Sequence, residues 1–131
     1  MDPQNRQNMR SPLARAIGLG SAKAGVGPWW AERVSAVALV PLTLWFAASI
    51  VAHARSDYAT FIAWLGTPLA AILMILLLIA LFYHTALGLQ VVIEDYVHSG
   101  AKFAAMIAVR LGCVALATTG IVAALHIAFN G

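Results

Sequence analysis

The sequence predicts an all-α membrane protein with three transmembrane helices. Hydrophobic residues make up 62% of the 131-residue chain and charged residues only 10%, whereas soluble domains contain about 45–50% apolar residues. A soluble fold of this size has too much surface to hide so much apolar material. The apolar residues also concentrate in three segments, each long enough to cross a bilayer, which takes about 20 residues. We expect residues 29–131 to form the three-helix domain and residues 1–28 a cytoplasmic N-terminal segment.

The first apolar segment covers about residues 34–52 and contains Pro41. A proline removes one helical hydrogen bond, and neighbouring helices can make good that loss in a membrane bundle. The second segment covers about residues 68–93 and the third about residues 103–129. Each is therefore expected to be one transmembrane helix.

The basic residues orient these helices. Most of them precede the first span: Arg6, Arg10, Arg15, Lys23 and Arg33. Only Arg55 lies between the first and second spans, and Lys102 lies between the second and third. Because loops rich in Lys and Arg stay in the cytoplasm, we expect a cytoplasmic N-terminus and a periplasmic C-terminus.

His84 is the most informative polar residue, because it interrupts the second apolar segment. It lies eleven residues before Asp95, which is about 16 Å along a helix. If Asp95 marks the cytoplasmic edge of a hydrocarbon layer about 30 Å thick, His84 is near its middle. A polar side chain at that depth costs free energy unless it is paired or used.

The helical phase places Gly88, Val91 and Asp95 on one stripe with His84, because steps of 4, 7 and 11 residues return close to the starting direction. A glycine one turn from the histidine opens a groove in which a flat ligand could lie. Haem is such a ligand, and a histidine nitrogen is its usual axial ligand. The alternative is that His84 bonds to another helix and Gly88 is a small-residue packing contact.

Four further polar residues are expected near the cytoplasmic face of the membrane or deeper in the bilayer. Asp95 belongs at the interface, because an acidic residue costs about 2.5–3.5 kcal/mol at a helix centre. Tyr96 suits the same depth, with its ring in the acyl boundary and its hydroxyl toward water. Arg33 is either an ordinary basic anchor or a fixed cation for a carboxylate, such as Asp95 or a haem propionate. Arg110 is expected about 12 Å below Lys102, and the sequence names no partner for it.

The stretch HTALGLQVVIEDYVH, residues 84–98, resembles the second helix of a known family. The family is the small cytochrome b-type hydrophobic membrane anchor of succinate dehydrogenase (respiratory complex II). The similarity consists of a histidine, a glycine four residues later, and Asp-Tyr eleven and twelve residues later. The stretch WWAERVSAVALVPL, residues 29–42, is similar to the opening of that family's first helix.

The resemblance implies roles for the matching positions. His84 would be an axial ligand of haem b iron, with the second ligand on a sister anchor protein, and Gly88 would leave room beside it. Arg33 would face a haem propionate. Tyr96 would donate a hydrogen bond to a carbonyl oxygen of ubiquinone, with Asp95 helping to hold the local network.

The resemblance also implies partners. The chain has no G-x-G-x-x-G flavin or nucleotide motif and one cysteine, too few to hold an iron–sulfur cluster. Succinate oxidation is therefore expected in a flavoprotein and an iron–sulfur protein docked on the cytoplasmic face. This chain would pack with a second cytochrome b anchor subunit, and it would pass electrons to ubiquinone without a succinate-oxidising site of its own.

Three alternative functions stay open at this point. A fumarate reductase anchor has the same three-span layout and can lack haem. A proton-conducting or transporter subunit would use His84, Asp95 and Arg110 as a relay, and an assembly factor would use every polar residue to join helices. We expect a bacterial inner membrane, although an arginine-bearing, acid-poor N-terminus could also suit mitochondrial import.

Overall fold

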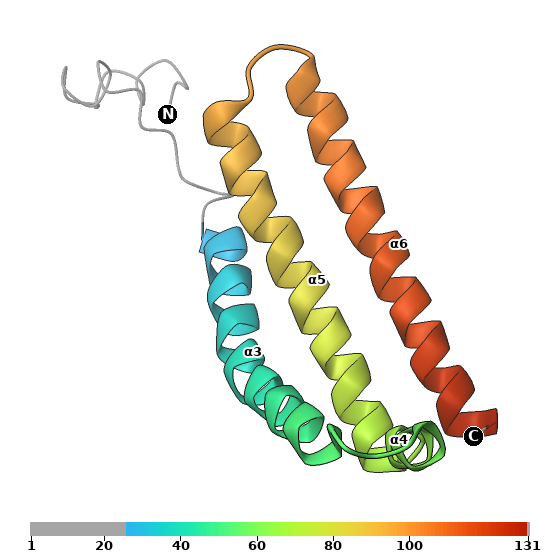
Figure 1. Cartoon of the computed structure of the whole chain (residues 1–131). Coiled ribbons are helices and arrows are strands. Elements are labelled where there is room, and N and C mark those ends of the chain that lie inside the picture. The colour runs from blue at the N-terminus through green and yellow to red at the C-terminus, as the bar shows by residue number, and fades with distance from the viewer. Residues whose placement is uncertain (1–25, 131) are drawn as a thin grey trace, which may run out of the picture.

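A computed structural model of the chain describes residues 26–130. These residues form four helices: α3 (Val26–His53), α4 (Tyr58–Leu65), α5 (Pro68–Tyr96) and α6 (Ala101–Asn130). Figure 1 shows three of them as long rods and α4 at one end of the rods. By length and composition α3, α5 and α6 can each cross a membrane, which confirms the three predicted spans. The expected segment 1–28 lies outside the described residues, except for its last three residues, which begin α3.

The helices extend beyond the expected spans. α3 begins at Val26 rather than near residue 34, and α5 continues to Tyr96. Pro28 fits the first turn of α3 because the N–H groups of that turn have no partner within the helix. Pro68 begins α5 directly after the N-cap residue Thr67. The apolar segments therefore mark only the parts of longer helices that lipid can surround.

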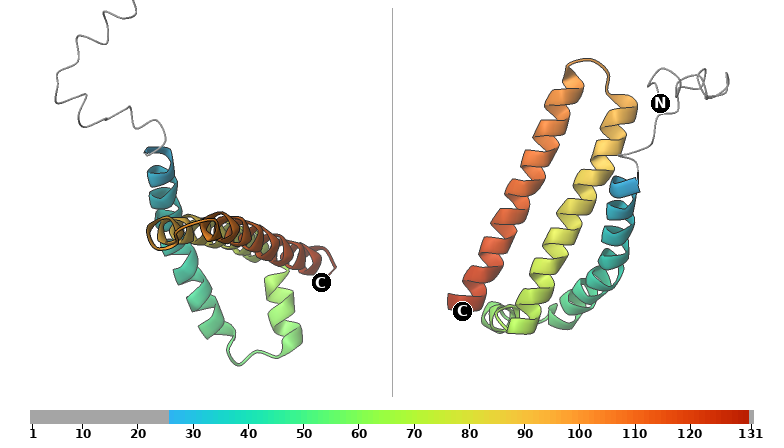
Figure 2. Two further views of the ribbon diagram at one scale, coloured as in Figure 1. Left: turned by 90° about the horizontal axis from the view of Figure 1, so that it is seen from above. Right: turned by 180° about the vertical axis from the view of Figure 1, so that it is seen from behind.

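The chain folds so that α5 lies between α3 and α6 (Figures 1 and 2). Both outer helices pack on α5. The approach of α6 to α5 is close at Gly120, where an added Cβ would lie 3.0 Å from Cδ1 of Leu78. α3 contains Pro41, and it continues past it and curves along its lower half (Figure 1). A proline inside a helix is a usual cause of such bending.

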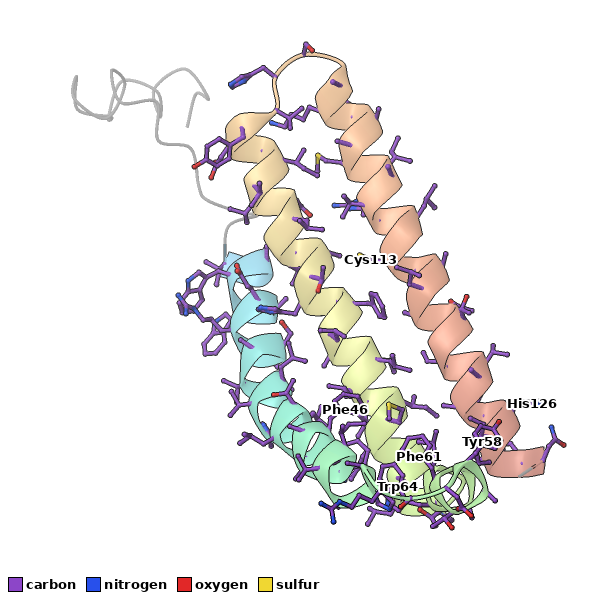
Figure 3. The ribbon with its side chains drawn as sticks, in the orientation of Figure 1. Phe46, Tyr58, Phe61, Trp64, Cys113 and His126 are labelled. Atoms are coloured by element: carbon purple, nitrogen blue, oxygen red, sulfur yellow. The ribbon has the colours of Figure 1, made fainter. Side chains whose placement is uncertain are left out.

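α4 is an element that the sequence did not predict. Asp57 caps it, with the carboxylate accepting a hydrogen bond from the Thr60 N–H at 2.9 Å. Figure 2 shows α4 running across the end of the bundle rather than along it. His53, at the end of α3, stacks on Trp64 of α4 with ring centroids 4.3 Å apart, and Phe61 lies 5.6 Å from the same indole. Phe61 and Trp64 are labelled in Figure 3, at the foot of α3. His53, which had no predicted role, thus belongs to an aromatic contact that joins α4 to α3.

Few side chains are buried within the described part of the chain. The buried apolar residues are Ala70, Ala71, Leu77, Ile93 and Ala124, and the buried polar residues are Ser35 and Ser49. Large apolar side chains are exposed along all three long helices. Such a surface needs lipid or partner helices around it, because an apolar face is stable only away from water.

Candidate functional site

The site begins with a contact between α3 and α5, a bond from His84 to another helix as its alternative interpretation expected, although the sequence did not name Ser35 as the partner. Nδ1 of His84 lies 3.0 Å from Oγ of Ser35, and the same hydroxyl donates to the Glu32 carbonyl oxygen at 2.9 Å. Ser35 is buried and the His84 ring is half-buried. The only hydrogen bond recorded for this ring among the described residues uses Nδ1. Nε2 is therefore left for another partner.

Gly88, one turn from His84, has open space beside it. A Cβ added at Gly88 would meet no atom within 4 Å outside its own helix, so this glycine is not packed against a described helix. Within residues 26–130 no group of three or more His, Cys, Asp or Glu side chains could hold a metal ion. A haem needs only one protein nitrogen from each side of the iron, and His84 beside an open Gly88 fits that requirement.

The length of α5 does not fix the depth of His84 in the bilayer. His84 lies 16 residues beyond Pro68, or about 24 Å along α5. α5 has 29 residues, or about 43 Å, and is therefore longer than a hydrocarbon layer about 30 Å thick. The mid-bilayer position of His84 stays a prediction.

The structure brings Arg33 to the level of His84 and not to that of Asp95. Arg33 is two residues from Ser35, about 3 Å along the axis, whereas Asp95 is eleven residues from His84, about 16 Å. The Arg33 guanidinium carbon lies 5.5 Å from the ring centroid of Trp29. No hydrogen bond is recorded in the described residues between Arg33 and either Asp95 or Tyr96. The suggested Arg33–Asp95 pair is therefore not formed, and the alternative partner, a haem propionate, stays a prediction.

Asp95 and Tyr96 lie in the last turn of α5, and both are exposed. Tyr96 is 79% exposed. Neither side chain makes a recorded hydrogen bond to a described residue, so the phenol and the carboxylate are available to a ligand or a partner subunit. The two predicted quinone-binding residues are thus adjacent in the chain but separated from His84 by about three helical turns.

Arg110 has a partner that the sequence did not reveal. Its Nη2 donates to Oε1 of Gln90 at 3.0 Å, and Nε2 of Gln90 donates to Oε1 of Glu94 at 3.0 Å. This chain of hydrogen bonds joins α6 to α5. Because His84 instead bonds to Ser35 on α3, the structure does not assemble the relay of His84, Asp95 and Arg110 that a proton-conducting subunit would use.

Two hollows lie between α3 and α5. A cleft of about 500 Å³ follows the last turns of α5, and a groove of about 540 Å³ lies deeper in the apolar part. The cleft is lined by Pro28, Trp29, Glu32, Leu87, Gln90, Val91 and Glu94. The groove is lined by Trp30, Ala31, Val34, Ser35, Ala38, Leu42, Leu76, Ile79, Ala80 and Tyr83. The cleft lining includes Glu32, Gln90 and Glu94 and the groove lining is almost wholly apolar, so together the two hollows suit an amphipathic molecule.

Sequence reasoning missed Ser35, Gln90 and Glu94. A serine or glutamine in a membrane helix is only weak evidence for an interhelical hydrogen bond, because the bond depends on which neighbouring helix the side chain faces. Arg110 was the available clue, since a guanidinium that lies among apolar residues needs a partner.

Comparison with known proteins identifies the family of the chain. The family model described as succinate dehydrogenase/fumarate reductase transmembrane subunit matches residues 7–125. The succinate dehydrogenase hydrophobic membrane anchor subunit of Rickettsia bellii is 37% identical over 90 residues, which cover 69% of this chain and 72% of that protein. The subunit of the same description from Paracoccus denitrificans is 35% identical over 97 residues, covering 74% of this chain and 75% of the relative.

A third relative, from Rickettsia conorii and of the same description, is 26% identical but covers 88% of this chain and 94% of its own length. No solved structure gives a significant match. The matched range contains α3 and α5 completely and α6 up to residue 125, and it includes His84, Gly88, Asp95 and Tyr96. The chain therefore belongs to the family of succinate dehydrogenase/fumarate reductase transmembrane subunits.

Proposed function

We propose that this chain is a membrane anchor of a succinate:ubiquinone oxidoreductase in a bacterial inner membrane. It binds haem b jointly with a second cytochrome b anchor subunit and forms part of a ubiquinone reduction site. Electrons arrive from a flavoprotein and an iron–sulfur subunit on the cytoplasmic face, as in the tricarboxylic acid cycle and the aerobic respiratory chain. The observation that carries the proposal is His84, held through Nδ1 by Ser35, with no hydrogen bond from Nε2 to any residue in 26–130 and open space at Gly88.

Three residues of this chain act toward the haem. His84 would bind the haem iron through Nε2, Gly88 would let the macrocycle approach the α5 backbone, and Arg33 would pair with a propionate. When bound, the haem would supply a one-electron carrier. Arg33 suits a carboxylate because its planar guanidinium can form two parallel hydrogen bonds.

Two residues act toward the quinone. The Tyr96 hydroxyl donates a hydrogen bond to a quinone carbonyl oxygen, and Asp95 beside it holds the polar network. Reduction of a quinone takes two electrons and two protons, so its head group must lie close to water. The exposure of Asp95 and Tyr96 in the last turn of α5 supports this placement, and the isoprenoid tail can extend along the apolar surface.

The orientation follows from the basic residues. The N-terminal segment and the α5–α6 turn face the cytoplasm, where the soluble partner proteins dock. α4 and its aromatic contacts then lie at the periplasmic interface, where aromatic side chains are favoured. This arrangement puts the haem and quinone residues on the side from which electrons come.

The test is purification of the intact complex from its native membrane. A flavoprotein, an iron–sulfur protein and a second anchor should co-purify, and the complex should show the Soret band of a b-type haem. His84→Ala should abolish or shift that band, whereas His98→Ala, at an exposed histidine in the α5–α6 turn, should leave it unchanged. Co-purification of the partner proteins in a complex that lacks the haem band would favour a fumarate reductase anchor. Ion flux through liposomes that contain this chain alone would favour a conducting subunit. Loss of assembly in His84→Ala without spectral change would favour an assembly factor.

A further inference from the structure

The Ser35 hydroxyl has two neighbours within hydrogen-bond distance. Its Oγ lies 2.9 Å from the Glu32 carbonyl oxygen and 3.0 Å from Nδ1 of His84. Ser35 is only 6% exposed, so lipid and water do not compete for these contacts. The hydrogen bond to a carbonyl three residues earlier is a common arrangement for serine in a helix.

The number of protons decides the direction of each hydrogen bond. A carbonyl oxygen can only accept, and a serine hydroxyl has one proton to donate. The hydroxyl therefore donates to Glu32, and its oxygen accepts from His84. A neutral imidazole has one N–H, which must then be on Nδ1, so Nε2 of His84 bears a free lone pair.

We infer that Ser35 is a positioning residue that holds His84 in the Nδ1-protonated form and so presents Nε2 to the haem iron. This inference rests on the proposed function and adds a residue on α3 to the haem site. A histidine that ligates a metal usually donates its other N–H to an acceptor, which fixes the orientation of the ring and strengthens the ligand. Ser35 is the acceptor in this chain.

Removal of the hydroxyl has two consequences at His84. The imidazole loses the contact that fixes its ring plane, and either nitrogen can then carry the proton. Nε2 also becomes a weaker electron donor, because Nδ1–H no longer has an acceptor. A weaker donor stabilises ferric iron less, so the midpoint potential of the haem should become more positive.

The experiment compares four variants of the intact complex purified from native membranes. Ser35→Ala removes the hydroxyl, and Ser35→Thr keeps it. Ser49→Ala is the matched control, since Ser49 is the other buried serine of α3 and does not contact His84. His84→Ala tests the ligand itself. The measurements are the haem-to-flavin ratio, haem retention during dilution, the EPR spectrum of the oxidised haem and its midpoint potential.

Ser35→Ala should weaken haem retention about 10- to 100-fold, shift the EPR g values and raise the midpoint potential. Ser35→Thr should restore these properties toward those of the unmodified complex, and Ser49→Ala should change none of them. If His84→Ala loses the haem but Ser35→Ala has unchanged EPR, potential and retention, the role of Ser35 is refuted and the proposed function stands. If His84→Ala keeps an unchanged haem, the proposed ligand itself is refuted.

A second measurement does not depend on the assembly of Ser35→Ala. In the unmodified complex labelled with ¹⁵N-histidine, nitrogen NMR distinguishes protonated from metal-bound ring nitrogens. A protonated Nδ1 together with an iron-bound Nε2 at His84 is the expected result. Iron bound to Nδ1, or a protonated Nε2, would overturn the inference.

Discussion

Arg110 of α6 donates a hydrogen bond to Gln90 of α5, with Nη2 and Oε1 3.0 Å apart. Gln90 in turn donates to Glu94, so a neutral amide lies between a cation and a carboxylate. This pairing explains how an arginine can occur within the third apolar segment. The two helices are thereby held in one register at this level of the bundle.

The first prediction concerns this pairing. Gln90→Leu and Arg110→Met should each lower the Tm of the purified complex, because each leaves the other side chain without its partner. The double variant should lose less than the sum of the two, with a coupling of about 0.6 kcal/mol, as is typical of hydrogen bonds between membrane helices. Glu94→Gln is the control, since an amide oxygen can still accept from Gln90. Strict additivity of the two single changes would contradict the contact.

The second prediction concerns the close approach of α5 and α6. Gly120→Ala places a Cβ 3.0 Å from Leu78 Cδ1, whereas a Cβ at Gly112 meets nothing within 4 Å. Each change replaces glycine with alanine inside a helix and so improves helix propensity by the same amount. The difference in stability between the two variants therefore measures the effect of the Cβ contact with Leu78. The Gly120→Ala complex should be less stable than the Gly112→Ala complex by about 1 kcal/mol. This is the lower end of the usual cost of overpacking, because the flexible end of the Leu78 side chain can move away. Thermal unfolding of the two variant complexes measures it, and equal Tm values would show that the helices do not approach closely here.

The third prediction concerns the cap of α4 and its dependence on pH. Hydrogen bonds from the side chain and the backbone N–H of Thr60 lower the pKa of Asp57 below its ordinary value. A carboxyl group whose pKa is lowered by folding stabilises the fold above its unfolded pKa, near 4, and that stabilisation is lost as the pH falls through the lowered value. The amide protection factors of α4, measured by hydrogen exchange, should therefore fall in acid.

Asp57→Asn supplies the control for this effect. Asparagine also caps helices but does not titrate, so its protection factors should change much less between neutral and acidic pH. Asp57→Ala should lack the protection at both pH values. An equal acid loss in Asp57→Asn would assign the effect to another group.

The fourth prediction concerns the quinone. Tyr96→Phe removes one hydroxyl, and a neutral hydrogen bond contributes about 0.5–1.5 kcal/mol, so quinone reductase activity should fall roughly 2- to 10-fold. Succinate oxidation with a soluble artificial acceptor should be unchanged. Tyr58→Phe is the matched control, because Tyr58 is 80% exposed and Tyr96 79%, and Tyr58 begins α4 at the opposite end. A parallel fall of both activities in Tyr96→Phe would make the phenol structural.

The sequence was sufficient for the three spans because soluble proteins rarely contain continuous apolar segments of this length. It was insufficient for α4, which reads as a loop because it is short and its apolar residues lie among polar turns. His84 stood out because a histidine inside an apolar segment is rare. Ser35 and Gln90 could not be predicted as the partners of His84 and Arg110. Which side chains meet depends on how α3, α5 and α6 are rotated and shifted along their axes relative to one another. The mid-bilayer depth of His84 stays a prediction, because α5 is longer than the hydrocarbon layer.

The scarcity of buried residues has a consequence for the life of the chain in the cell. With five apolar and two polar side chains buried among the described residues, the bundle has almost no interior. Its apolar faces must then be covered by lipid or by neighbouring helices, and a copy released into water would expose them and aggregate. Delivery into the bilayer while the chain is still being made is what such a surface demands.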